Sequence, residues 1–130
     1  MLHTETVEAG TLDLIKRLMA DAELHDFFMV GGTALSLLIG HRISIDIDLF
    51  TEKDFDASAL RRYLEQYHRM TDAKTIGNGI FGFIDNVKID IIAHKYPLIK
   101  PLQIIDGIRM SSLEDIGVMK LKVAILIINS

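Results

Sequence analysis

This 130-residue chain contains Gly31-Gly32-Thr33-Ala34-Leu35, followed closely by His41-Arg42-Ile43-Ser44-Ile45-Asp46-Ile47-Asp48-Leu49-Phe50. In the second segment isoleucine and leucine alternate with Ser44, Asp46 and Asp48. This spacing predicts a strand with one apolar and one polar face. The two aspartates therefore share the polar face, and a pair of glycines precedes them.

The composition limits the classes of protein to consider. With 49% hydrophobic residues the chain fits one compact domain. It has no cysteine, which excludes disulfides, a zinc-thiolate site and a thiol nucleophile, and we expect a cytoplasmic protein. The amino terminus does not resemble a secretion signal, and the longest apolar run, Val123–Ile128, is too short to span a membrane. A net charge of −4 argues against a surface that coats nucleic acid broadly but allows a local basic rim.

Hydrophobic spacing predicts the other elements. We expect helices over Thr11–Leu24, Thr33–Ile39 and Asp56–His68, and a last helix that begins at a capping box of Ser111 and Glu114. We expect strands over Phe27–Val30, Ile80–Ile84, Val87–Ala93 and Leu102–Ile105, with a two-residue hairpin turn at Asp85-Asn86. This order predicts an α/β (α+β) fold, a small mixed sheet flanked by helices.

The glycine pair has a chemical reading and a structural one. Amides at the start of a helix carry partial positive charge, and Gly31 and Gly32 would let a phosphate approach them closely. A glycine pair is also a common tight turn, and taken alone it indicates a turn more strongly than a phosphate site.

Asp46 and Asp48 are candidate metal ligands. Residues two apart on a strand lie roughly 7 Å apart on one face, close enough to hold metals bridged by phosphate oxygens. Oxygen ligands of this kind suit Mg²⁺ or Mn²⁺. The alternative is the solvent face of a half-buried strand, but aspartate is a poor strand former and like charges repel, so a bound cation explains the pair better.

Asp90 lies in the predicted strand Val87–Ala93, and its side chain points to the opposite face from those of Ile89 and Ile91. If this strand neighbours the strand of Asp46 and Asp48, Asp90 joins the same polar face. It could then ligate a metal or accept a proton from an attacking hydroxyl. Taken alone, Asp90 reads as a surface residue.

Two segments, Phe28–Leu35 and His41–Phe50, closely resemble the signature of the AbiEii/AbiGii-type nucleotidyltransferase toxins, of the DNA-polymerase-beta-like nucleotidyltransferase superfamily. A looser resemblance reaches Asp90 and Glu114–Lys122. The resemblance to this family implies a nucleotidyltransferase-like core, a nucleoside triphosphate substrate, transfer RNA as the acceptor in some relatives, and an antitoxin partner in toxin-antitoxin or abortive-infection systems.

The resemblance also implies roles for individual residues. Asp46, Asp48 and Asp90 would be catalytic and would bind the metals, with Asp90 helping to activate the acceptor hydroxyl. The residues implied to bind the nucleotide are Gly31, Gly32, Thr33, Arg42, Ser44 and Lys120. For Arg42 a salt bridge with a neighbouring acid, and for Lys120 an exposed helix face, are equally good interpretations.

The chain departs from the family pattern at its end. Family members usually continue past the helix that carries the residue matching Lys120 into a further helical part. We therefore expect residues 1–130 to form one nucleotidyltransferase-like domain that lacks this helical part. The apolar end, Val123–Ile128, packs within the domain, forms a homo-oligomer contact, or marks a fragment. We therefore keep two alternatives to RNA modification: a protein-modifying nucleotidyltransferase, and a truncated, inactive remnant that binds a partner.

Overall fold

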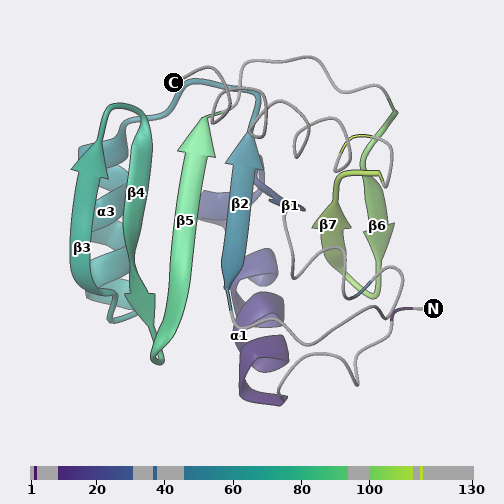
Figure 1. Ribbon diagram of the computed structural model, residues 1–130, viewed down its shortest axis with the longest axis horizontal. Helices are drawn as coiled ribbons and strands as arrows, with labels where there is room; N and C mark the ends of the chain where they lie inside the picture. The colour runs from purple at the N-terminus through teal and green to yellow at the C-terminus, as the bar shows by residue number, and fades with distance from the viewer. Residues whose placement is uncertain are drawn as a thin grey trace, which may run out of the picture.

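The computed structural model describes residues 2, 9–30, 37, 46–93, 100–112 and 115 (Figure 1). Its helices are α1 (Ala9–Ala20), a short 3-10 helix η2 (Ala22–Leu24) and α3 (Ala57–Tyr67). Its strands are β1 (Phe28–Val30), β2 (Ile47–Thr51), β3 (Thr71–Ile76), β4 (Gly79–Ile84), β5 (Val87–Ala93), β6 (Gln103–Ile105) and β7 (Ile108–Met110).

The seven strands form one mixed sheet in the order β3-β4-β5-β2-β1-β7-β6. β2 runs parallel to β5 and antiparallel to β1, while β1 runs parallel to β7. The two described α-helices and one face of the sheet contribute to a single apolar core, and Figure 1 shows α3 behind β3 and β4. The expected fold class, a mixed sheet with helices, is confirmed.

Both helices form where the apolar spacing predicts them. α1 buries Leu14, Ile15 and Leu18, and α3 buries Leu60 and Leu64. Asp56 caps α3, because its carboxylate accepts a hydrogen bond from the Ala59 amide at 3.0 Å. Tyr67, the last residue of α3, is 65% exposed and its ring lies against that of Tyr63.

The predicted hairpin is present, and two further strands were missed. Asp85 and Asn86 have φ values of 54° and 65°, which a two-residue turn between twisted strands requires. β3 has no apolar alternation, since it is a largely exposed edge strand, so spacing could not find it. β7 is only three residues long, but the turn before it, Asp106-Gly107, carries a readable signal, with φ values of 53° and 79°.

The capping box at the start of the last helix was placed one residue too early. The Asp115 amide donates to Ser112 Oγ at 3.1 Å, and Ser112 Oγ donates to Asp115 Oδ2 at 2.9 Å. The cap is therefore Ser112 with Asp115, not Ser111 with Glu114. The rest of that predicted helix, nearly all of the helix predicted over Thr33–Ile39, and the part of the predicted strand before Asp46 lie outside the described residues.

The two faces of the sheet differ sharply in chemistry. Ile47 and Leu49 on β2 pair with Ile89 and Ile91 on β5, and all four are fully buried in the core. The alternate positions point away from this core and carry the carboxylates. The functional question therefore concerns the face opposite the helices.

Candidate active site

Asp48 and Asp90 lie directly side by side. They are register partners on the parallel strands β2 and β5, so their side chains emerge from the same face of the sheet. Val30, the last residue of β1, pairs with Asp48 from the other side. The condition set by the sequence, that the two strands be neighbours, is met, and the two carboxylates meet in the middle of the sheet.

This position disfavours negative charge on both aspartates. Burial and the nearby charges of Asp90 and Asp46 raise the pKa of Asp48 to about 6. Burial also raises the pKa of Asp90, although the Lys88 ammonium group opposes the shift. Two partly buried carboxylates that repel each other form a site whose charge calls for compensation.

The described residues supply little of that compensation. Lys88 Nζ lies 3.9 Å from Asp90 Oδ2, and the lysine side chain is 52% exposed, so water screens the pair. Asp90 Oδ1 is buried and has no hydrogen-bond partner among the described residues. Burying a carboxylate oxygen without a hydrogen-bond partner costs folding free energy. A bound cation, or a hydrogen bond from a substrate hydroxyl, would satisfy this oxygen.

Asp46 contributes charge to the pair but is not one of a close trio. It is exposed, precedes β2, and raises the pKa of Asp48 and of Asp90 through space. Within the described residues no three His, Cys, Asp or Glu side chains come close enough to hold a metal ion. The structure therefore brings together two of the three predicted metal ligands, and a pair of carboxylates that binds Mg²⁺ jointly with substrate phosphates fits this donor set.

The predicted nucleotide-binding residues fall outside the described residues. This applies to Gly31, Gly32, Thr33, Arg42, Ser44 and Lys120, whose roles stay predictions. Gly31 follows Val30 directly in the chain, and Val30 pairs with Asp48. The glycine pair thus begins at the residue that follows Val30, the strand partner of Asp48.

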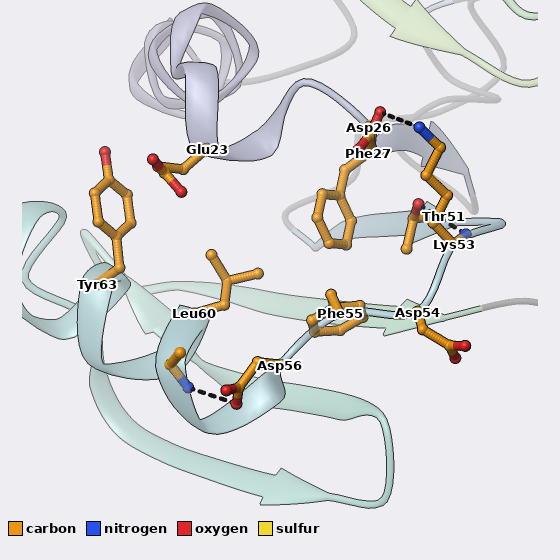
Figure 2. Close-up of a pocket in the computed structure, with 11 residues that line it drawn as sticks. Glu23, Asp26, Phe27, Thr51, Lys53, Asp54, Phe55, Asp56, Leu60 and Tyr63 are labelled. Carbon is orange, nitrogen blue, oxygen red and sulfur yellow. Dashed lines mark hydrogen bonds and ion pairs between the residues drawn. The ribbon is translucent and has the colours of Figure 1, made fainter.

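A separate cavity of about 260 Å³ opens between η2, the loop after β2 and the start of α3 (Figure 2). The side chains that line it include four carboxylates and one ammonium group: Glu23, Asp26, Asp54, Asp56 and Lys53. Lys53 Nζ is engaged by Asp26 at 3.2 Å. A triphosphate would be repelled here, and none of the predicted site residues lines this cavity.

A part-buried polar cluster that the sequence gave no reason to expect joins the end of α1 to the end of α3. Asp21 accepts hydrogen bonds from the Tyr63 hydroxyl at 2.8 Å and from the Glu23 amide at 2.9 Å, and it lies 2.5 Å from His68 Nε2. Although burial opposes it, these hydrogen bonds hold the pKa of Asp21 below its usual range. The cluster is remote in sequence from the aspartates of the sheet and is a structural link.

Arg109 on β7 is a second unexpected link. Its guanidinium donates to the carbonyl oxygens of Met19, Leu24 and Phe27 at 2.9 to 3.0 Å. These oxygens belong to the end of α1, the end of η2 and the residue before β1. Burial lowers the pKa of Arg109, yet an arginine stays charged there. Arg109 therefore fixes the segment that leads into β1 and towards Asp48.

The arrangement of strands matches that of solved nucleotidyltransferases. A proposed nucleotidyltransferase from Thermotoga maritima, TM1012, superposes with a TM-score of 0.71 at 15% identity, covering 92% of this chain and 88% of that one. The Thermotoga maritima CCA-adding enzyme, solved in complex with tRNA, gives a TM-score of 0.54 at 22% identity over 69% of this chain and 22% of that one. At these identities the likeness shows a shared fold.

The sequence comparison adds a family. An uncharacterized protein of Aquifex aeolicus (strain VF5), aq_aa25, is 34% identical over 100 residues, which are 74% of this chain and 48% of that protein. The chain thus spans about half the length of this curated relative. The family model described as nucleotidyl transferase AbiEii toxin, type IV toxin-antitoxin system, matches residues 13–125. On this match, the chain belongs to the AbiEii nucleotidyl transferase toxin family.

Proposed function

We propose that this protein is a metal-dependent nucleotidyltransferase that moves a nucleoside monophosphate from a nucleoside triphosphate to a hydroxyl of RNA, with tRNA as the acceptor class. The observation that carries the proposal is the pairing of Asp48 with Asp90 on one face of adjacent strands. Membership of the AbiEii family supports the reaction class. The CCA-adding enzyme solved with tRNA, which shares the fold, supports the acceptor class.

In the proposed reaction an acceptor oxygen bonds to the α-phosphorus, the bond from that phosphorus to the oxygen bridging to the β-phosphate breaks, and pyrophosphate leaves. Mg²⁺ or Mn²⁺, when bound, offsets negative charge on the attacking and leaving oxygens. Asp48 would hold the cation together with Asp90. Asp46 would add negative charge to the site. We assign triphosphate binding to Gly31, Gly32, Thr33, Arg42, Ser44 and Lys120.

Asp90 would also take the proton of the acceptor hydroxyl. Its Oδ1 is buried and has no hydrogen-bond partner among the described residues, and burial raises the pKa of the group. A carboxylate with a raised pKa is a better proton acceptor than an exposed one. The neighbouring Lys88 ammonium group moderates that shift.

We further propose a toxin role in a toxin-antitoxin or abortive-infection system, with an antitoxin protein as partner. The basis is family membership. Within the described residues no helix is long and apolar enough to cross a membrane. A cytoplasmic location, where nucleoside triphosphates and tRNA are available, is part of the same proposal.

The test is to incubate the protein with each labelled nucleoside triphosphate, Mg²⁺, and either total tRNA or cell protein. We expect label on RNA, lost in Asp48→Asn and Asp90→Asn and kept in Asp13→Asn, a matched change on the exposed side of α1. Label on protein would reject the RNA acceptor and keep nucleotidyl transfer. Absence of label with every donor would reject the activity and leave a binding remnant.

A further inference from the structure

The face that carries Asp48 and Asp90 continues outward to the edge of the sheet. Lys74 on β3 pairs with Phe81 on β4, Phe81 pairs with Asp90, and Asp90 pairs with Asp48. Register partners point to the same face, so these four side chains form one row across four strands. With strands about 4.8 Å apart, Lys74 lies roughly 10 Å from Asp90.

A neighbouring row repeats the same chemistry. Phe83 on β4 pairs with Lys88 on β5, on the same face as Phe81 and Asp90. Phe83 is 39% exposed and the Lys88 side chain is 52% exposed. Two aromatic rings and two ammonium groups thus lie interleaved beside the carboxylate pair. We call Lys74, Phe81, Phe83 and Lys88 the β3–β5 surface.

Side chains at the β1 end of the row through Asp48 are buried, and those at the β3 end are exposed to solvent. On the β1 side Val30 is 3% exposed, and Phe28 on the same face is 2% exposed. On the β3 side Lys74 is exposed, and Ile76 beside it is 67% exposed. A polymer that must bring its end to Asp90 therefore finds open surface on the side of β3, β4 and β5, which Figure 1 shows in front of α3.

The ring of Phe81 lies over the backbone of Gly79 on this surface. A Cβ atom at Gly79 would lie 2.8 Å from Phe81 Cε2, so the ring covers the backbone of the glycine. The glycine leaves room for the ring beside Asp90.

We propose that the β3–β5 surface binds the single-stranded 3′ end of the acceptor RNA, with Phe81 and Phe83 stacking on bases and Lys74 and Lys88 contacting phosphates. This inference rests on the proposed nucleotidyl transfer to RNA. Stacking rings beside cationic side chains are the features that bind single strands without regard to sequence. Lysine is depleted in protein interfaces and frequent at phosphate contacts, so the two lysines favour RNA over a protein partner, whereas aromatic side chains occur in both kinds of interface.

The charges at and beside the surface are mixed: Lys88 lies 3.9 Å from Asp90, whereas Lys74 is exposed at the outer end of the row. Asp85 in the β4–β5 turn is paired with Arg17 of α1 at 3.2 Å, so its charge is offset. Lys74 and Lys88 extend from the exposed face. The net charge of −4 belongs to the whole chain and does not prevent a local basic strip.

The experiment measures binding of a 5′-fluorescein single-stranded oligoribonucleotide of roughly 12 nucleotides, a length matched to common single-strand sites, by anisotropy in EDTA without nucleotide. The test variants are Phe83→Ala and Lys74→Gln. The matched controls are Tyr67→Ala and Arg62→Gln, an exposed aromatic and an exposed cation on α3, which packs against the other face. Thermal melting of each variant verifies folding.

We expect Phe83→Ala to weaken binding about 5-fold or more, the loss of one stacked base. Lys74→Gln should weaken it and reduce the slope of log affinity against log salt by about 0.7, one phosphate contact. The controls should bind like the wild type. Any of three results would overturn the inference: unchanged RNA affinity in both test variants, an equal loss of affinity in the controls, or no RNA binding by the wild type. If a protein and not RNA binds this face, one of these results is expected.

The two proposals fail in distinguishable ways. If Phe83→Ala weakens RNA binding but the wild type transfers no nucleotide, the surface stands and the activity falls. If the wild type labels RNA, and Phe83→Ala and Lys74→Gln bind and label RNA equally well, the activity stands and the surface falls. Asp90→Asn should abolish transfer and leave RNA binding unchanged or somewhat stronger, because it removes a negative charge beside a surface that binds a polyanion.

Discussion

Asp48 and Asp90 are register partners on parallel strands, and burial raises the pKa of both carboxyl groups. Threonine or valine at either position would make a more stable sheet. The protein thus keeps an unfavourable arrangement at the centre of its sheet, as functional sites commonly do. The cost of this pairing can be measured.

The first prediction concerns Asp48→Asn in the absence of metal. The folded pKa of about 6 lies above the usual aspartate value of 3.8, so folded Asp48 binds its proton more tightly than the unfolded chain does. Its contribution to stability is fully present below pH 4 and is lost as pH rises to 6. We expect Asp48→Asn to match the wild type near pH 4 and to be more stable by about 1 to 3 kcal/mol at pH 7.5.

Urea unfolding in EDTA at the two pH values checks this prediction. Asp13→Asn, on the exposed side of α1, serves as the control and should change stability little at either pH. Asp48→Asn less stable than the wild type at pH 7.5 would show that other residues already compensate the charge of Asp48.

The second prediction concerns divalent cations. A cation that binds only the folded protein stabilises it by about 2.7 kcal/mol at a concentration 100 times its Kd. We expect Mg²⁺ or Mn²⁺ to raise the Tm of the wild type by several degrees, and not that of Asp48→Asn or Asp90→Asn. Differential scanning fluorimetry with a magnesium titration measures it. An equal shift in all three proteins would place the binding site elsewhere.

The third prediction concerns the cluster of Asp21, Tyr63 and His68. Asp21→Ala leaves the Tyr63 hydroxyl and His68 without their acceptor and should cost about 2 to 4 kcal/mol, whereas Tyr63→Phe removes one hydrogen bond and should cost less. Because the pKa of Asp21 is lowered, its contribution is present above 3.8 and is lost as pH falls further. Chemical denaturation at pH 7 and pH 3 tests both points. A cost for Asp21→Ala that is equal at both pH values would show that charge plays no part.

The fourth prediction concerns Arg109. Arg109→Met leaves three carbonyl oxygens without their donor, and we expect a loss of about 2 to 4 kcal/mol. Arg109→Lys should restore little, because one ammonium group lacks the planar fork that reaches three acceptors. Equilibrium unfolding of both variants is the measurement. Full recovery by lysine would mean that charge alone, and not the guanidinium geometry, stabilises this contact.

Local sequence patterns were sufficient for much of the fold. Alternation found the strands of Asp48 and Asp90, helical spacing found α3, and Asp85-Asn86 marked the hairpin. β3 was missed because an exposed edge strand needs no apolar face, and β7 because three residues show no period. Both are stabilised by their neighbours in the sheet, which local patterns do not record.

The site was predictable only in part. Residue spacing predicted that Asp46 and Asp48 lie on one strand. It could not predict that the strand of Asp90 would lie beside the strand of Asp48, because that depends on the order of strands in the sheet. Nothing in the sequence indicated that Asp21 and His68, or Arg109 and the carbonyl of Met19, would meet, because such contacts depend on how distant elements pack. The β3–β5 surface likewise required the register of four strands.

The parallel pairing of β2 with β5 has a consequence for synthesis of the protein. β2 gains this neighbour only after α3 and the β3–β4 hairpin have been made, since residues 49–89 separate the two aspartates. A nascent chain that ends at β4 carries Asp48 without Asp90. The carboxylate pair, and any chemistry that depends on it, can therefore form only after β5 has left the ribosome.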